Sequence, residues 1–273
     1  MRLRFLFFIC FILMCNSLFA QIFRFGVPNL EEYDKRRFHY GFSLGIDIVD
    51  VNLKTRNNYL YPQNISPTNA VMQIYSKPTP AFHVGIVVNM RMGEYFDLRF
   101  VPAFSIAHDL NLYYRFAETI LDPNQGASGG WTDLILRKIE CHYINFPLFV
   151  KFKSSRMHNV RIYVFGGGQV GINMMSAKNN KIPKLDPQGA GAEITPIIKP
   201  YDVQVKGGFG FDFYTTYFKF STEFKVAFGV INMLENDKNI KDREQIEAYR
   251  TSPIITGIKS LKSKSFTVSF IIE

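Results

Sequence analysis

Residues 201–230, YDVQVKGGFGFDFYTTYFKFSTEFKVAFGV, decide the fold that this sequence predicts. In the first half, bulky apolar residues occupy the odd positions from Val203 to Phe213 except Gly207, and polar residues or glycine occupy the even positions. In the second half, bulky residues occupy the even positions from Phe218 to Val230 except Thr222. A period of two is typical of a β-strand, because successive side chains point to opposite faces of a sheet. The stretch therefore predicts a β-hairpin.

A tight turn at residues 215–216 would close this hairpin. The register that it predicts pairs Phe213 with Phe218, Phe211 with Phe220, and Val203 with Phe228. One face is then a wall of aromatic rings, whereas the other combines charges with glycine, serine and alanine. Small residues suit a narrow enclosed space better than a solvated surface, since glycine weakens a strand. We expect the phenylalanines to face lipid and the small residues to face a tight lumen.

The composition and the first residues indicate an exported all-β protein. Aromatic residues make up 15% of the chain, and no long helical tract is apparent. Residues 1–20 combine Arg2 and Arg4, an apolar run, and small or polar residues before Ala20, as in a secretory signal peptide. Cleavage is expected between Ala20 and Gln21. It would lower the formal net charge from +9 to +7 and leave Cys141 without an intramolecular disulfide partner.

The alternating pattern recurs along the rest of the chain. We count eight strands, at residues 40–48, 82–91, 96–106, 143–152, 160–173, 203–213, 218–230 and 266–272. Their connections alternate between long and short, with long loops near residues 54–80, 108–137, 174–200 and 232–252. This alternation is typical of outer-membrane barrels, which have long extracellular loops and short periplasmic turns. No later segment has the roughly 18 apolar residues of a membrane helix, so a spanning form must be a barrel.

The predicted fold is therefore an all-β, eight-stranded antiparallel transmembrane β-barrel over residues 39–273. A signal peptide at 1–20 and a periplasmic N-terminal lead-in at 21–38 precede it. Pro147 interrupts the fourth strand, and because proline cannot donate to a ladder, we expect a bulge there.

Charged residues on the inward face form the candidate site, a polar network in the lumen made of Arg91, Asp97, Arg99, Lys206, Asp212, Glu223 and Lys225. A short turn would place Arg91 opposite Asp97. In the predicted hairpin, Glu223 lies between Lys225 and, diagonally, Lys206. Eight strands leave an interior that side chains just fill, so we interpret the network as a plug rather than an ion path. We expect no catalytic, cofactor-binding or metal-binding residue.

Weaker patterns have simpler explanations. Gly166, Gly168 and Gly171 match a dinucleotide-binding motif. Residues 172–187 lack the helical period that such a site needs, so we favour a strand without large side chains at a point where neighbouring strands crowd the lumen. Ser105 with His108 or His142 could form a lipid-modifying site, which only the identity of the residues supports. The five histidines have no metal-ligand spacing, and they are His39, His83, His108, His142 and His158.

Two stretches resemble the PorT (SprT) proteins of Bacteroidota. The first contains Asn29, Leu30, Tyr33, Asp34 and Lys35, followed by His39, Tyr40, Gly41, Phe42, Leu44 and Gly45. The second, residues 143–151 (YINFPLFVK), is similar to the mid-barrel motif of that family, with Asn145 where the family carries a glutamate. The resemblance implies an outer-membrane component needed for type IX secretion, in some species alongside gliding motility, with no catalytic residues to carry over.

The predicted function is a non-enzymatic accessory or assembly component of type IX secretion, because so small a pore cannot pass a folded protein. The alternatives are a generic structural or adhesive barrel, a lipid-modifying outer-membrane enzyme, and a soluble lipocalin-like carrier with its aromatic residues turned inward. The net positive charge suits contact with the phosphates of outer-membrane lipid and lipopolysaccharide, or with an acidic partner. Other secretion-system proteins are expected partners, and nucleic acid is not.

Overall fold

The strands close into a ring. The computed structural model describes residues 29–56, 71–122, 126–131, 135–176, 196–235 and 257–273. The ring strands are β1 (Phe38–Thr55), β3 (Thr79–Arg91), β4 (Phe96–Phe100), β5 (Ala103–Ile106), β9 (Tyr143–Lys153), β10 (Val160–Asn173), β11 (Tyr201–Tyr214), β12 (Lys219–Gly229) and β13 (Ile258–Ile272).

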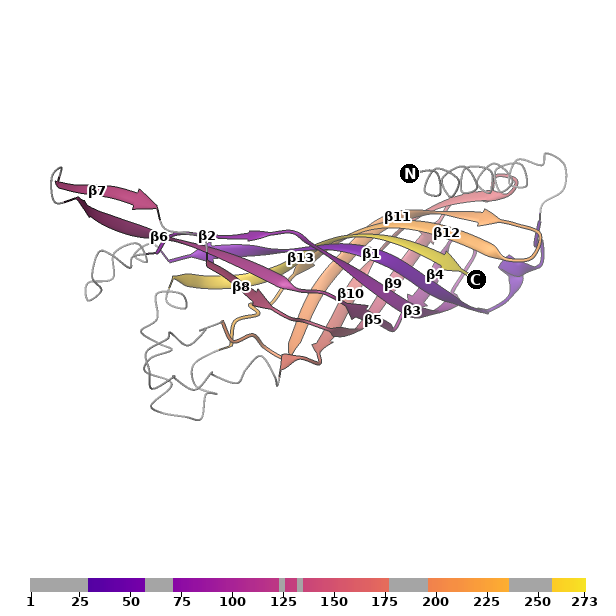
Figure 1. The fold of residues 1–273 in the computed structure, drawn as a ribbon. Coiled ribbons are helices and arrows are strands. Elements are labelled where there is room, and N and C mark those ends of the chain that lie inside the picture. The colour runs from indigo at the N-terminus through magenta and orange to yellow at the C-terminus, as the bar shows by residue number, and fades with distance from the viewer. Residues whose placement is uncertain (1–28, 57–70, 123–125, 132–134, 177–195, 236–256) are drawn as a thin grey trace, which may run out of the picture.

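All pairings in the ring are antiparallel, in the order β1, β13, β12, β11, β10, β9, β4, β3, and β3 pairs again with β1 (Figure 1). Strands β4 and β5 share one place, because both pair with β3 on one side and with β9 on the other. The barrel therefore has eight positions, which confirms the predicted fold class.

The two faces of each strand differ as predicted. On β1, Tyr40 and Phe42 are each 66% exposed, whereas Ser43 and Asp47 on the other face are 0% and 4% exposed. Similar outward rows run along β3, β9, β10 and β13, and include Val84, Ile86, Leu148, Val150, Val164, Phe266 and Phe270. The inward face carries polar and small side chains. An apolar belt with a polar interior is the arrangement of a membrane barrel.

The register of the hairpin that β11 and β12 form differs from the prediction by two residues. Phe213 lies opposite Phe220, Phe211 opposite Thr222, and Val205 opposite Phe228. The turn holds four residues rather than two, because the Thr215 N–H and hydroxyl both donate to the Phe218 carbonyl, at 3.0 and 2.7 Å. A shift of two leaves every side chain on its predicted face, so the error does not alter the lumen.

Pro147 produces no bulge in its own strand. Strand β9 keeps one register with β10 through the Gln169–Pro147 pair. The break lies in the neighbouring strand, between β4 and β5, where the Val101 N–H donates to the Pro147 carbonyl at 3.3 Å. The missing N–H of Pro147 therefore coincides with the interruption of the adjacent strand.

Short turns lie at one end of the barrel, which we call the short-turn end, and the opposite end is the loop end. Two predicted long loops are partly strands. The region 54–80 contains β2 (Val71–Lys77), and 108–137 contains β6 (Leu110–Asp122), β7 (Gly126–Trp131) and part of β8 (Ile135–Ile139). These four form a sheet that extends beyond the barrel with the loop-end parts of β1 and β13 (Figure 1). Strand β1 is accordingly 18 residues long.

An apolar cluster, the loop-end core, fills the barrel beneath this sheet. On β1 the inward row changes from Asp47 to the buried Val49 and Val51, which pack with Leu112 and Leu261. The other members include Ile74, Ala81, Leu110, Tyr114, Ile139, Cys141, Tyr143, Ile198, Met233 and Ile258.

The chain before β1 covers the short-turn end. Residues 29–37, which we call the N-terminal cap, include the helical turn η1 (Tyr33–Lys35). The expected signal peptide, its cleavage site at Ala20 and Gln21, and the first part of the lead-in lie outside the described residues. Within the described ranges, no helix has the length and apolar character to cross a membrane.

Candidate functional site: the polar lumen and its two ends

Arg99 of β4 lies at the centre of a buried ion-pair network. Its guanidinium pairs with the Glu223 carboxylate of β12 and, at 3.3 Å, with Glu273 after β13. The second Glu223 oxygen lies 2.8 Å from Lys225 Nζ, and the Tyr163 hydroxyl donates to Glu223 at 2.8 Å. These charges come from different strands and neutralise one another, so the network ties opposite walls of the barrel together.

Two further pairs extend the network. Lys151 Nζ lies 2.9 Å from Asp212, which also accepts the Ser221 hydroxyl at 2.6 Å. Lys153 Nζ lies 2.7 Å from Asp97. All five side chains are buried. The lumen at this level is therefore filled by buried, paired charge.

Sequence reasoning missed several members of the network, namely Lys151, Lys153, Lys219 and Glu273. Lys219 pairs with the Glu273 carboxylate. All four were detectable, because each has the same parity in its strand as inward-facing residues already identified, such as Asn145 on β9 and Glu223 on β12. Counting every charge on the inward face, rather than those of selected strands, would have found them.

Two of the predicted members behave differently from the prediction. Arg91 does lie opposite Asp97, but Asp97 pairs with Lys153 and accepts from Asn89 at 3.0 Å. Lys206 lies opposite Ala227 in the observed register. Glu223 is held instead by Arg99 and Lys225.

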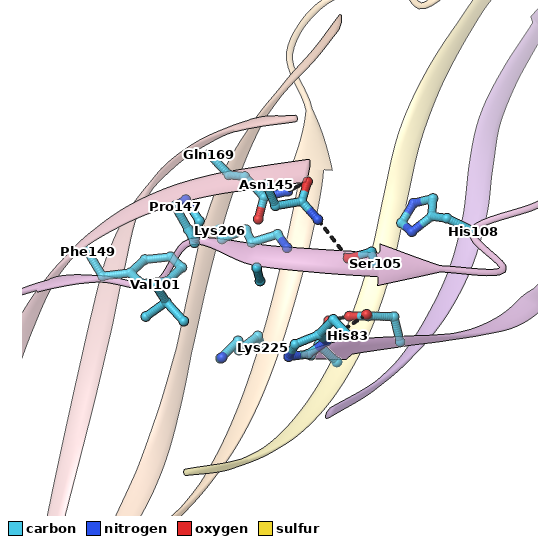
Figure 2. Close-up of a pocket in the computed structure, with 13 residues that line it drawn as sticks. His83, Val101, Ser105, His108, Asn145, Pro147, Phe149, Gln169, Lys206 and Lys225 are labelled. Atoms are coloured by element: carbon cyan, nitrogen blue, oxygen red, sulfur yellow. Dashed lines mark hydrogen bonds and ion pairs between the residues drawn. The ribbon is translucent and has the colours of Figure 1, made fainter. Parts of the chain in front are cut away.

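Lys206 lines a small cavity in the lumen, on the loop-end side of the network (Figure 2). The cavity volume is about 30 Å³, which accommodates roughly two water molecules. Asn145 forms part of its wall, donating to Ser105 Oγ at 2.7 Å and accepting from Gln169 at 2.8 Å. The glutamate position of the resembled family therefore carries a neutral, hydrogen-bonded amide here.

Asp47 and His83 line this cavity, and together with Ser269 they follow the order of a hydrolase triad. His83 Nδ1 is 2.8 Å from Asp47, and His83 Nε2 is 3.3 Å from Ser269 Oγ. A triad needs space for a scissile bond next to the hydroxyl. Ser269 is 0% exposed, receives a hydrogen bond from Lys225 at 3.1 Å, and is not one of the residues that line the cavity. The three residues are therefore placed as structural partners within the polar lumen.

The weaker chemical patterns of the sequence are not assembled in the described residues. Ser105 is bonded to Asn145, and no hydrogen bond between Ser105 and His108 occurs in the described part of the chain. Gly166, Gly168 and Gly171 all lie within strand β10, so the dinucleotide motif lacks its helix there. Across the described ranges, no group of three or more metal-ligating side chains is found.

The N-terminal cap is fixed to the barrel by a cluster around Asp34. The Asp34 carboxylate accepts from Arg161 and from the Tyr214 hydroxyl, each at 3.0 Å. Arg156 donates to the Asn29 carbonyl, and its guanidinium lies 3.8 Å above the Tyr214 ring. The cap thus contacts the turn between β9 and β10, the start of β10 and the end of β11.

Tyr33 continues this contact into the lumen. Its ring stacks on His39 at 4.3 Å and lies beneath Lys219 at 4.9 Å, and its carbonyl is 2.7 Å from His39 Nε2. Burial raises the pKa of the Tyr33 hydroxyl. The short-turn end is therefore covered by ordered chain, as the loop end is filled by the apolar core.

These features define a class: a closed eight-stranded barrel with an apolar exterior and an ion-paired, plugged interior. The chain belongs to the outer membrane protein beta-barrel domain family, whose model matches residues 19–235. It is thus an outer-membrane barrel, with the short-turn end periplasmic and the loop end extracellular. A search of curated proteins found no match.

Solved structures with a similar chain trace are also outer-membrane or surface proteins. Neisserial surface protein A is 6% identical, with a TM-score of 0.38 and coverage of 87% of this chain and 99% of that one. OprG from Pseudomonas aeruginosa is 9% identical, with a TM-score of 0.41 and coverage of 90% and 97%. Ail of Yersinia pestis, in complex with the heparin analogue sucrose octasulfate, is 11% identical, with a TM-score of 0.34 and coverage of 87% and 99%. The fold assignment rests on the strand pairing and the family match.

Proposed function

We propose that this protein is a non-enzymatic outer-membrane component that assists the assembly or regulation of the type IX secretion system. The observation that carries the proposal is the closed lumen: paired charges fill its middle, apolar side chains fill the loop end, and the N-terminal cap covers the short-turn end. Such a barrel cannot conduct cargo. Its contribution must come from surfaces presented at its two ends.

The resemblance to the PorT (SprT) proteins supports the choice of system. Its more specific stretch, which includes Asn29, Tyr33, Asp34 and Lys35, is the segment that caps the periplasmic end. Asn29 contacts Asn159 and Tyr214 at 2.8 and 3.1 Å, so this segment has a defined shape. The exposed charges of Glu31, Glu32, Lys35, Arg36 and Arg37 beside it offer a surface for a periplasmic partner.

A deletion strain tests the secretion role. We expect loss of type IX cargo from the medium and its accumulation in the periplasm, with recovery on expression of the full chain. A D34N variant should recover secretion only in part, because it weakens the ion pairs of Asp34 with Arg161 and Arg156, which hold the cap on the barrel. Normal export of all cargo in the deletion strain would refute the secretion role and leave the fold untouched.

Conductance tests the closed lumen separately. The purified chain in planar bilayers should show no steady conductance, because Arg99 and four buried lysines of the lumen are paired with carboxylates, the lysines being Lys151, Lys153, Lys219 and Lys225. Stable open channels would contradict the plugged interior.

A structural or adhesive role is the second candidate, and the extracellular sheet of β2, β6, β7 and β8 favours it. Tyr75 and Tyr113 stack at 5.2 Å on that sheet, and Lys77 lies 4.8 Å from the Tyr113 ring.

Cross-linking from residues 29–37 should capture secretion proteins under the first proposal. Cross-links only from the extracellular sheet, to surface ligands, would favour the second.

A further inference from the structure

A groove at the periplasmic rim contains basic residues that the lumen network does not use. It lies between the N-terminal cap and the turn from β3 to β4, with a volume of about 550 Å³. Its walls include Lys35, Arg37, Met90, Arg91, Met92 and Glu94. Three cations and one carboxylate therefore share an open space beside two methionines.

Arg37 and Arg91 are held directly opposite each other. The pairing of β1 with β3 sets Phe38 opposite Met90, and the next main-chain bond, from Arg91 N–H to the Arg37 carbonyl, is 2.8 Å long. Like charges facing each other across two strands are destabilising. An anion between them would reverse the sign of that interaction.

In the described part of the chain, no carboxylate forms an ion pair with either arginine, and this includes Glu94, which lines the same groove. Asp97, opposite Arg91 on the other side, is occupied by Lys153 at 2.7 Å. Arg91 Nε donates to the Gly93 carbonyl at 3.1 Å, which satisfies one of the N–H donors of the Arg91 guanidinium. No ion pair of Arg37 or Arg91 is found among the described residues. The remaining guanidinium donors are suited to bidentate recognition of a phosphate.

The groove lies where the apolar belt ends. Phe38, Met92, Tyr95 and Phe96 are 45%, 62%, 44% and 48% exposed around it. Basic residues next to such a boundary lie at the level of lipid phosphates. Methionine side chains adapt to flexible apolar partners. The groove thus offers charge for a headgroup and an apolar wall for a chain.

We propose that this groove binds a phospholipid of the periplasmic leaflet, with its phosphate between Arg37 and Arg91. Lys35 adds positive charge, and Met90 and Met92 contact an acyl chain. The proposal depends on the outer-membrane fold and not on the role in secretion. An acidic protein segment would satisfy the cations but would not need the methionine wall at the membrane boundary.

Native mass spectrometry of the full chain in detergent micelles, titrated with phosphatidylglycerol, tests the proposal. R37Q and R91Q should each weaken phosphatidylglycerol binding about tenfold, the effect of losing one charge-assisted hydrogen bond. The matched control is R36Q, which removes the same charge from the adjacent exposed residue outside the groove. R36Q should bind as the unmodified chain does.

The competing outcomes are distinct. Millimolar inorganic phosphate should not displace the lipid, and displacement would indicate a site for free phosphate instead. Equal loss in R36Q and R37Q would indicate nonspecific attraction and overturn the proposal. Binding of an acidic peptide but not of phosphatidylglycerol would do the same. Heat-modifiable gel migration shows whether each variant keeps the closed barrel. R37Q should keep it, because losing the Arg37 charge removes its repulsion with Arg91.

Discussion

The buried charges in this lumen depend on one another, because removing one leaves its partners unpaired away from water. Glu223 has contacts from Arg99, Lys225 and Tyr163. E223Q would leave Arg99 and Lys225 short of a carboxylate in a site closed to water. Breaking a buried pair costs roughly 3–5 kcal/mol. Urea unfolding of the barrel in lipid vesicles, followed by circular dichroism, should show a loss of that size.

The control for E223Q is E32Q. Glu32 pairs with Lys35 at 3.0 Å, but both side chains are exposed, at 83% and 71%, and Lys35 lowers the pKa of the Glu32 carboxyl. Water screens such a pair, so E32Q should leave the unfolding free energy unchanged. Equal effects of E223Q and E32Q would contradict the account of the buried network.

Two adjacent glycines of β10 provide a second residue-scale prediction. A methyl group on Gly167 would collide with the Leu148 carbonyl of β9, whereas one on Gly166 would find no atom closer than 4.0 Å. G167A should therefore destabilise the barrel by about 1–3 kcal/mol, the usual cost of overpacking. G166A should be neutral or slightly stabilising, since it restricts the unfolded chain. The same urea titration distinguishes them, and a harmless G167A would show that β9 and β10 are less closely packed than described.

His108 makes stability depend on pH. It follows β5, outside the ring strands, and burial lowers its pKa to about 4. An unfolded histidine titrates near 6.5, so below that pH the unfolded state binds the proton more readily. The contribution of His108 is therefore complete above about pH 6.5 and is lost as the pH falls toward 4.

Unfolding free energies measured from pH 7 to pH 4 test this dependence. H108Q should flatten the decline relative to the unmodified chain. H158N changes an exposed histidine in a short turn, and this variant should show the same decline as the unmodified chain. A decline of the same slope in H108Q would assign the pH dependence to other groups.

At the scale of elements, the alternating pattern predicted which residues face inward but not how strands are aligned. Parity alone fixes the face, whereas the alignment depends on the turn, and the four-residue turn at Thr215 depends on a side-chain hydrogen bond that propensity does not reveal. The same limit applies to Pro147. A bulge was expected in its own strand, but β9 keeps one register, and the interruption between β4 and β5 that lies opposite contains a second proline, Pro102.

The N-terminal cap should detach when its central carboxylate is removed. D34N weakens the ion pairs with Arg161 and Arg156, at 3.0 and 3.9 Å. We expect faster amide hydrogen exchange over residues 29–37, with unchanged protection in β11 and β12. E31Q is the matched control, because Glu31 is exposed in the same segment. Unchanged exchange in D34N would mean that Asn29 and Tyr33 hold the cap without it.

At the scale of the whole molecule, closure into eight strands was predictable and the extracellular sheet was not. Each membrane strand repeats the same outward row, so the series is visible in the sequence. Strands β2, β6 and β8 bury one face against the loop-end core, in regions that also contain proline, glycine and polar residues. Their pairing with one another is set by the barrel that brings them together. The lumen network was half predictable, since parity revealed its members but not their partners.

The central claim is that the aromatic face of the barrel meets lipid. Spin labels at Phe209 and Phe228, which are 47% and 57% exposed, test it most directly in a C141S background in liposomes. The label at each position should relax readily with oxygen dissolved in the bilayer and little with a water-soluble nickel complex, while a label at Ser221 should respond weakly to both. Strong relaxation of Phe209 and Phe228 labels by nickel, with little effect of oxygen, would mean that this face is in water and would contradict the membrane barrel.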